Sequence, residues 1–319
     1  MSSTSPVAAV LVTGASSQLG VFVLPRLRAA GFTVLAISRQ APAQALQRAP
    51  GLYWLRPEQA LSGAAVTGLV DMGCVRHLVS CGPLGLAAQL VERYESLRRV
   101  VAFSSSSVVA KAASGDAAEA AQVAELAAGE AALRAGCATR GAALLLLRPT
   151  LIYGCGLDRN VSRLLRLAHR WGLVPLAGKA GGLRQPVHAD DLAAVAIAAL
   201  LAAEPVRLVS PACGGSTLTY RQMTARLFAV CARQPRLPGL PEGLLVSLVK
   251  LALRLPAARG LNAEMVKRQN RNLVFDDSRL REALPYRPRP FEPTATDFEI
   301  PASARALQLP ARSSSGAGT

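Results

Sequence analysis

The residues best suited to chemistry near the N-terminus are the glycines of the segment TGASSQLG, residues 13–20. The segment follows a short apolar run, residues 7–12, and precedes an apolar stretch with helical spacing. A turn from strand to helix points backbone N–H groups and the helix dipole at an anion such as a pyrophosphate. Gly14 permits the tight turn, and Gly20 lets the helix pack closely on the strand. The pattern predicts a dinucleotide site, although ordinary turns also use glycine.

A second candidate is the end of the next apolar run, Ile37-Ser38-Arg39. NAD-binding sites of this kind place a carboxylate here for the ribose 2′-hydroxyl, whereas an arginine accommodates a 2′-phosphate. Ser38 and Arg39 supply a hydroxyl and a cation, and no carboxylate. We therefore expect NADP(H) more than NAD(H) as the cofactor. The alternative is an ordinary surface arginine in an arginine-rich chain.

Four serines, residues 104–107, lie where a third apolar run ends. Hydroxyl groups at the carboxyl end of a parallel strand lie where open α/β sheets bind ligands. The alternative is a polar loop whose hydroxyls cap backbone groups.

Regular elements must position these segments, and the apolar pattern predicts them. Strands are predicted over residues 7–12, 33–38, 77–80, 100–104 and 142–147. Helices are predicted over residues 18–30, where Pro25 should cause a kink or break, and over 116–136, 161–171 and 190–203. The alternation predicts an α/β protein with a Rossmann-type, doubly wound parallel sheet covered on both faces. Residues 301–319 are expected to form a disordered tail.

Composition narrows the class of protein. The chain has 319 residues, of which 51% are hydrophobic, so it is too apolar to be disordered. The formal net charge of +16 favours anionic partners, but the richness in Arg, Ala and Gly suggests that part of it is compositional bias. Basic residues are not clustered among aromatic ones, and nucleic-acid binding is not expected.

Cysteine and histidine spacing argues against disulfides and metals. Six scattered cysteines form no C-x-x-C pair, and three histidines lack the spacing of metal ligands. The first residues lack the basic start of a signal peptide, and the longest uncharged apolar run, residues 192–203, is too short to cross a bilayer. We expect a cytoplasmic protein with reduced thiols.

Four segments together resemble a known superfamily: TGASSQLG, FSSSSV, LRPTLIYG and RQPVHADDLA. In this order they are similar to the extended short-chain dehydrogenases/reductases, and within these to the nucleoside-diphosphate-sugar epimerases, dehydratases and reductases. The resemblance covers about residues 7–295. It implies an NAD(P)-binding domain over residues 1–150, returning at about 184–203, and an interleaved substrate domain over 151–300. The site would lie between them.

The resemblance also implies roles for individual residues. Ser106 matches the catalytic hydroxyl, and Ser17 replaces a glycine of the cofactor loop. The implied cofactor-binding residues are Thr13, Gly14, Ser17, Gln18, Leu19, Gly20, Ser38, Arg39, Ser80, Ser104, Pro149 and Thr150. The implied substrate-binding residues are Tyr153, Arg184, His188 and Arg289. For Tyr153 and His188, packing and structural hydrogen bonding are the alternatives.

The chain departs from the family at its Tyr-x-x-x-Lys motif, whose tyrosine transfers a proton. Aligned on Glu130, the two positions hold Gln122 and Leu126, and neither is an acid or base near pH 7. Lys111 is the candidate replacement, because a lysine with a depressed pKa can move a proton. A solvated loop lysine is the alternative.

Two hypotheses for function follow. The first is an NAD(P)-dependent oxidoreductase or epimerase acting on a nucleotide-sugar or related substrate. The second is a non-catalytic dinucleotide-binding assembly or sensor protein of the same fold. A homodimer is compatible with either.

One segment falls outside the family pattern: residues 243–255, GLLVSLVKLALRL. Its helical spacing places Leu245 and Leu248 on an apolar face and Lys250 on a narrow basic stripe. Such a helix can lie in a membrane interface. The alternative is a helix of the substrate domain packed on the core.

Overall fold

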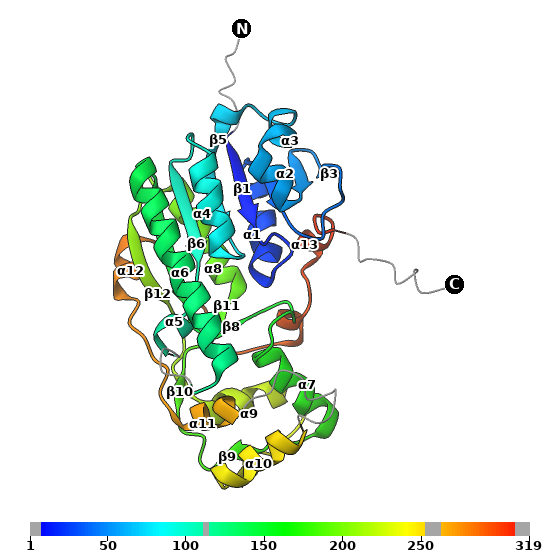
Figure 1. Cartoon of the computed structure of the whole chain (residues 1–319). Coiled ribbons are helices and arrows are strands. Elements are labelled where there is room, and N and C mark those ends of the chain that lie inside the picture. Colours follow the sequence, from blue (N-terminus) through cyan, green and yellow to red (C-terminus); the bar gives the residue numbers. More distant parts are fainter. Residues whose placement is uncertain (1–7, 111–114, 253–262, 310–319) are drawn as a thin grey trace, which may run out of the picture.

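A computed structural model describes residues 8–110, 115–252 and 263–309. Its largest element is an eight-stranded sheet with the strand order β12-β7-β6-β5-β1-β2-β4-β3 (Figure 1). All neighbouring strands pair in parallel except β3 and β4. The strands are β1 (Ala9–Thr13), β2 (Thr33–Ile37), β3 (Leu46–Ala49), β4 (Leu52–Leu55), β5 (Val75–Ser80), β6 (Arg99–Phe103), β7 (Ala143–Pro149) and β12 (Leu208–Ala212).

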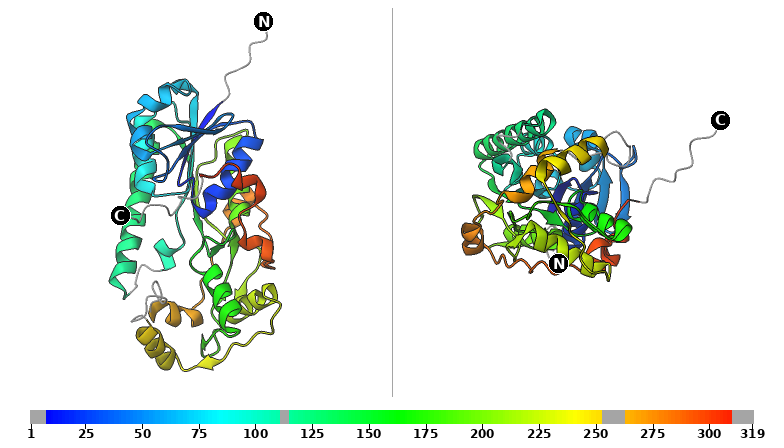
Figure 2. Two further views of the ribbon diagram at one scale, coloured as in Figure 1. Left: turned by 90° about the vertical axis from the view of Figure 1, so that its right-hand side faces the viewer. Right: turned by 90° about the horizontal axis from the view of Figure 1, so that it is seen from below.

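Helices cover both faces of this sheet (Figure 2). One face carries α1 (Gln18–Ala29) and α8 (Ala189–Leu201), and the other carries α4 (Leu84–Arg93) and α6 (Ala117–Arg140). The shorter helices of this lobe are α2 (Pro57–Ser62), α3 (Ala64–Thr67), η1 (Met72–Cys74) and α5 (Ser107–Ala110). The predicted α/β class with a doubly wound parallel sheet is confirmed.

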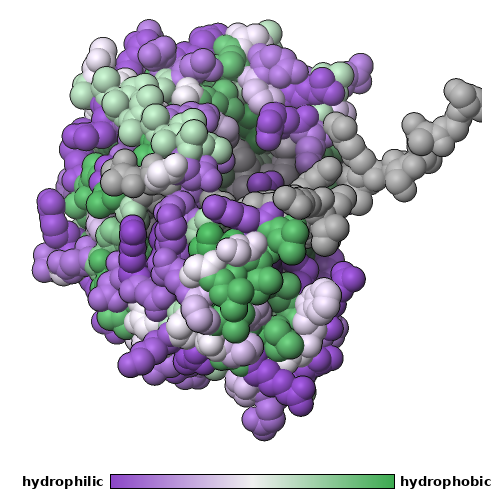
Figure 3. Space-filling view, turned by 60° about the horizontal axis from the view of Figure 1, so that its bottom comes forward, coloured by the Kyte–Doolittle hydropathy of each residue, from purple (hydrophilic) through white to green (hydrophobic). Residues whose placement is uncertain are grey.

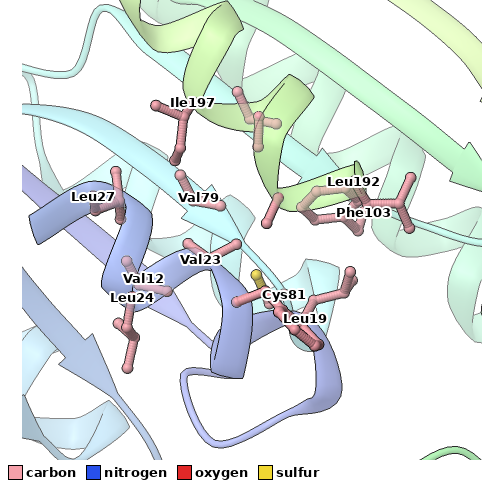
Figure 4. Close-up of a cluster of buried hydrophobic side chains, with 14 of the residues drawn as sticks. Val12, Leu19, Val23, Leu24, Leu27, Val79, Cys81, Phe103, Leu192 and Ile197 are labelled. Atoms are coloured by element: carbon pink, nitrogen blue, oxygen red, sulfur yellow. The ribbon is translucent and has the colours of Figure 1, made fainter. Parts of the chain in front are cut away.

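The core between α1, α8 and the sheet explains why the strands are apolar throughout (Figure 4). Val12, Val79 and Phe103 reach it from three neighbouring strands, and Leu24 and Leu192 reach it from the two helices. A strand covered on both faces buries every side chain, so its sequence does not alternate.

Three local predictions change. Helix α1 continues through Pro25 without a break, held by buried residues on either side of it. Helix α6 extends four residues beyond its predicted end, to Arg140, before Gly141 adopts the left-handed conformation that ends it. Strand β12 was not predicted, and it pairs in parallel with β7 at the edge of the sheet.

A second lobe lies beyond the carboxyl ends of the strands, at the bottom of Figure 1. It is built from short ladders and helices around three small cores. Its elements are β8 (Ile152–Tyr153), α7 (Val161–Trp171), β9 (Leu176–Ala177), β10 (Leu183–Arg184), β11 (Val187–His188), β13 (Leu218–Thr219), α9 (Tyr220–Val230), β14 (Gly239–Leu240), α10 (Glu242–Ala252), α11 (Ala263–Lys267) and η3 (Arg268–Asn270). The domain boundary at about residue 150 stays a prediction.

The C-terminal part of the chain returns to the sheet lobe through α12 (Ser278–Ala283), η4 (Ala295–Phe298) and α13 (Ala302–Arg305). Helix α13 packs against α1, and Ala304 is fully buried. The indole Nε1 of Trp54 donates to the carbonyl of Leu307 at 3.0 Å. The prediction of a disordered tail is therefore wrong for residues 301–309, because buried contacts hold them. Residues 310–319 lie outside the described part of the chain.

Candidate functional site

The turn between β1 and α1 has the geometry that its glycines predicted. Gly14 has φ +63°, and a Cβ atom there would lie 2.4 Å from the carbonyl oxygen of Cys81. A Cβ atom on Gly20 would lie 2.3 Å from the carbonyl oxygen of Ala15. Only glycine fits at either position without moving backbone.

Ser17, which stands where the family has a glycine, caps helix α1. Its Oγ accepts a hydrogen bond from the N–H of Gly20 at 3.2 Å. The N–H groups of Gln18 and Leu19 have no acceptor among the described residues. The start of this twelve-residue helix therefore offers two free donors and a positive dipole end to an anion.

A cavity of about 320 Å³ lies beside this turn. Four predicted cofactor residues line it: Gly14, Ser17, Ser38 and Arg39. The remaining lining residues were not predicted: Ser16, Ile37, Gln40, Pro57, Cys81, Gly82, Pro83 and Leu86. Residues 81–83 could have been predicted from the sequence. They follow the carboxyl end of β5, the strand next to β1, where ligands bind in open α/β sheets.

Hydroxyl groups and a cation form the far end of this cavity. The Oγ atoms of Ser16 and Ser38 lie 2.6 Å apart, and Ser38 Oγ also accepts from the N–H of Gln40 at 3.1 Å. Arg39 is exposed beside them. Among the described residues that line the cavity, none carries a carboxylate.

Two of the predicted cofactor residues lie inside the sheet instead. Thr13 and Ser80 are both fully buried, and the Thr13 hydroxyl donates to Ser80 Oγ at 3.0 Å. Their hydroxyls therefore join β1 to β5 behind the glycine turn, and neither lines the cavity.

The structure brings the serine segment together with the end of β7. The N–H of Ser104 donates to the carbonyl of Leu147 at 2.8 Å, and that of Ser106 donates to the carbonyl of Pro149 at 3.0 Å. Thr150 Oγ1 donates to the carbonyl of Gln185, so it ties this edge to the second lobe. The half-buried Ser106 hydroxyl has no hydrogen-bond partner within the described ranges.

Helix α6 carries no proton-transferring side chain where the family has tyrosine and lysine. Gln122 is exposed, and Leu126 is half-buried. The buried Glu130 accepts two hydrogen bonds from Arg148, at 3.0 and 2.5 Å. Burial alone would raise the pKa of Glu130, but the hydrogen bonds from Arg148 outweigh it, so the pKa is lowered and the carboxylate stays ionised. The predicted substitute, Lys111, lies outside the described residues.

Arg184 has surroundings that favour a structural role. Its guanidinium donates to the carbonyls of Leu183, Arg268 and Arg271, at 2.5 to 2.7 Å, and lies 5.4 Å from the ring centre of Tyr220. Burial lowers its pKa to about 10. Its contact with a substrate phosphate stays a prediction, and in this conformation its donors face backbone.

The other predicted substrate residues are also held by protein groups. His188 caps α8, because its Nδ1 accepts from the N–H of Asp190 at 3.1 Å, and its Nε2 lies 3.4 Å from Asp297 Oδ1. Tyr153 is buried edge-on against His188, and burial raises its pKa. Arg289 pairs with Asp190 and with Asp191, at 2.9 and 2.8 Å. These contacts agree with the packing and structural alternatives for Tyr153 and His188.

The apolar face predicted for residues 243–255 is divided in the structure. Leu245 of α10 is buried against Ala177 and Val266, whereas Leu248 points outward and is 45% exposed. Within the described residues, no helix is long and apolar enough to cross a membrane.

The same described residues contain no group of three His, Cys, Asp or Glu side chains that could hold a metal ion.

Comparisons of the sequence find no relatives. No family model matches the chain, and no curated protein matches it.

Comparisons of the structure find many proteins of the same fold. UDP-N-acetylglucosamine 4-epimerase from Bacillus cereus aligns over 92% of this chain and 94% of its own, with TM-score 0.63 and 15% identity. UDP-glucose 4-epimerase from Thermotoga maritima, solved with UDP-glucose, aligns over 94% and 100%, with TM-score 0.64 and 14% identity. dTDP-glucose 4,6-dehydratase from Bacillus anthracis, solved with NAD, aligns over 92% and 96%, with TM-score 0.64 and 12% identity. The chain thus has the fold of the nucleoside-diphosphate-sugar epimerases and dehydratases, as its motifs predicted.

Proposed function

We propose that this protein is an NAD(P)-dependent oxidoreductase or epimerase that acts on a nucleotide-sugar or a related substrate. The observation that carries the proposal is the cavity between the glycine turn, the end of β2 and the turn after β5. Two free N–H groups at the start of α1, together with glycines that leave no room for a Cβ atom, suit a pyrophosphate. The epimerases and dehydratase of the same fold support the substrate class.

The cofactor proposed for this cavity is NADP(H). Ser38 and Arg39 offer a hydroxyl and a cation to a 2′-phosphate, and the lining has no carboxylate to bind a 2′-hydroxyl. The dehydratase of the same fold was solved with NAD, so the preference for NADP(H) rests on these two residues. When bound, the dinucleotide would supply or accept the hydride.

The chain itself would supply orientation and one hydroxyl. Ser106 lies beside the end of β7, and its Oγ is free to donate to a substrate oxygen. With Gln122 and Leu126 in place of tyrosine and lysine, the proton must move through Lys111 or a water molecule. This makes the proposed active site a non-standard one.

Native mass spectrometry and nucleotide titration test the cofactor proposal. We expect NADPH to bind more tightly than NADH, and Arg39→Ala to weaken NADPH binding by about tenfold or more while leaving NADH nearly unchanged. Arg48→Ala is the matched control, because Arg48 is an exposed arginine of the same lobe outside the cavity. Equal effects of Arg39→Ala on the two dinucleotides would refute the preference.

The second candidate function is a non-catalytic dinucleotide-binding assembly or sensor protein. It is favoured by α6, whose two buried carboxylates, Glu119 and Glu130, are each held by an arginine. The hydrogen bonds from Arg148 lower the pKa of Glu130, so this side chain is not suited to donate a proton near neutral pH. Dinucleotide binding without hydride exchange across a panel of nucleotide-sugars would support this candidate over the enzyme.

A further inference from the structure

The helix α10 presents leucines to solvent along one face. Leu244, Leu248 and Leu251 follow each other at intervals of four and three residues, so they share a face of the helix. They are 50%, 45% and 58% exposed. The neighbouring side, with Leu245 buried and Val246 and Val249 partly buried, packs on the second lobe and holds the helix in place. The exposed leucines therefore belong to an anchored helix.

Two further apolar side chains lie at the same end of the molecule. Trp171, the last residue of α7, is 65% exposed, and Leu173, in the turn that leads to β9, is 42% exposed. Strand β9 pairs with β14, which leads directly into α10. Figure 3, which turns this end toward the viewer, shows an apolar area bordered by hydrophilic side chains. We call Leu244, Leu248, Leu251, Trp171 and Leu173 the apolar tip.

The charge around the apolar tip is mostly positive. Residues 161–183 and 231–252, the stretches that carry the tip, contain a single acidic residue, Glu242. Six exposed cations of these stretches pair with no carboxylate among the described residues: Arg166, Arg170, Lys179, Arg233, Arg236 and Lys250. In the stretches that carry the apolar tip, these six cations therefore outnumber the single carboxylate of Glu242.

We propose that the apolar tip docks on the surface of an anionic phospholipid bilayer. Leucines on an anchored helix can enter the boundary between headgroups and acyl chains, where tryptophan is also favoured. The surrounding cations would then face lipid phosphates, each contributing to binding at low salt. The inference does not depend on the proposed enzymatic function.

Other occupants of the tip fit the charge less well. A second copy of the chain, joined by a two-fold axis, would place the same basic surround against itself. Like charges facing each other across an interface are unfavourable. A bilayer rich in phosphate is the occupant that complements the surface.

Flotation of the full-length protein with lipid vesicles tests the proposal. We expect it to float with vesicles of phosphatidylcholine and phosphatidylglycerol, and to float much less with phosphatidylcholine alone or at high salt. The double variant Leu248→Ser, Leu251→Ser should lower the partition coefficient by about tenfold or more, since two large apolar side chains no longer leave water. Thermal denaturation checks that each variant is folded.

The matched control is the double variant Leu201→Ser, Val274→Ser, which changes two comparably exposed apolar residues away from the tip. It should float like the unchanged protein. Tryptophan fluorescence gives a second readout, because Trp54 is fully buried and a vesicle-induced blue shift must come from Trp171. Absence of flotation, equal flotation of the Leu248/Leu251 variant, or equal binding to uncharged vesicles would each overturn the proposal.

Discussion

At the scale of single residues, the candidate cofactor cavity depends on two glycines, whose lack of a side chain leaves room for close backbone contacts. Gly14 and Gly20 leave backbone atoms of neighbouring segments where any Cβ atom would collide. The groups that can bind an anion there are the free backbone N–H groups of Gln18 and Leu19, whose positions are fixed by helix α1. A site of this kind is sensitive to one added methyl group.

Replacing Gly14 with alanine should therefore destabilise the fold and abolish dinucleotide binding. The φ of +63° costs a non-glycine residue about 1–2 kcal/mol, and the collision with Cys81 adds to this cost. Gly31→Ala is the control, because Gly31 has φ +83° but no heavy atom within 4 Å of its added Cβ. Urea unfolding and NADPH titration measure both effects. Equal behaviour of the two variants would contradict the role given to the close contact.

Ser106→Ala tests the role proposed for the Ser106 hydroxyl in the enzyme. If the Ser106 hydroxyl polarises the substrate, hydride exchange with nucleotide-sugars should fall by about a hundredfold while NADPH binding is unchanged. Ser62→Ala, a change at an exposed serine of α2, should have no effect. Turnover that survives in Ser106→Ala would remove this residue from the proposed mechanism.

At the scale of elements, the short helix η4 is fastened to the start of α8 through Asp297. This carboxylate accepts from the N–H and hydroxyl of Thr294, at 2.7 and 2.9 Å, and lies near His188. Burial alone would raise the pKa of Asp297, but contacts with His188 and Thr294 lower it to about 2. Ionised Asp297 thus stabilises the folded chain.

The pH dependence of stability should reveal this contact. A depressed carboxylate pKa gives a stabilisation that is complete above the unfolded value of about 4 and is lost as the pH falls toward 2. We expect the difference in unfolding free energy between the unchanged protein and Asp297→Asn to shrink by about 1–2 kcal/mol over that window. Urea titrations between pH 5 and pH 2.5 measure it. A constant difference would show that Asp297 is not the titrating group.

The elements that could be predicted from sequence are those with local causes. Strands β1 and β2 lie within two residues of their predictions because buried apolar runs end at turns. Strand β12 was missed because LVSPA has no distinctive pattern, and only its pairing with β7 makes it a strand. The order at residues 301–309 depends on Trp54, more than 240 positions away in the chain.

The candidate site divides in the same way. Gly14, Ser17, Ser38 and Arg39 line the cavity because a turn motif is local and keeps its geometry in any parallel sheet. The surroundings of Arg184 depend on carbonyls of residues 268 and 271, which no spacing within its own segment announces. Contacts between side chains and backbone groups that are far apart in the sequence therefore could not be predicted from the sequence pattern.

At the scale of the whole molecule, a buried ion pair connects the two lobes. Glu119, in the first turn of α6, accepts from both Nη atoms of Arg268 at 2.7 Å, and both side chains are about one-tenth exposed. The carbonyl of Arg268 is in turn held by Arg184. This ion pair thus joins the helix beside the serine segment to the second lobe.

A double-mutant cycle tests how strongly this pair couples the lobes. Removing the Glu119 carboxylate leaves the buried charge of Arg268 uncompensated, so Glu119→Gln should cost about 3–5 kcal/mol of stability. The double variant Glu119→Gln, Arg268→Met should cost less than the sum of the two single variants by about 1–3 kcal/mol. The exposed pair of Arg140 and Glu95 is the control, and Glu95→Gln should cost under about 1 kcal/mol. Urea unfolding of all four variants gives the comparison. If Glu119→Gln lowers the unfolding free energy by no more than Glu95→Gln does, the pair contributes little to the stability of the contact between the lobes. The lobes would then be held together by their apolar contacts and the remaining ion pairs.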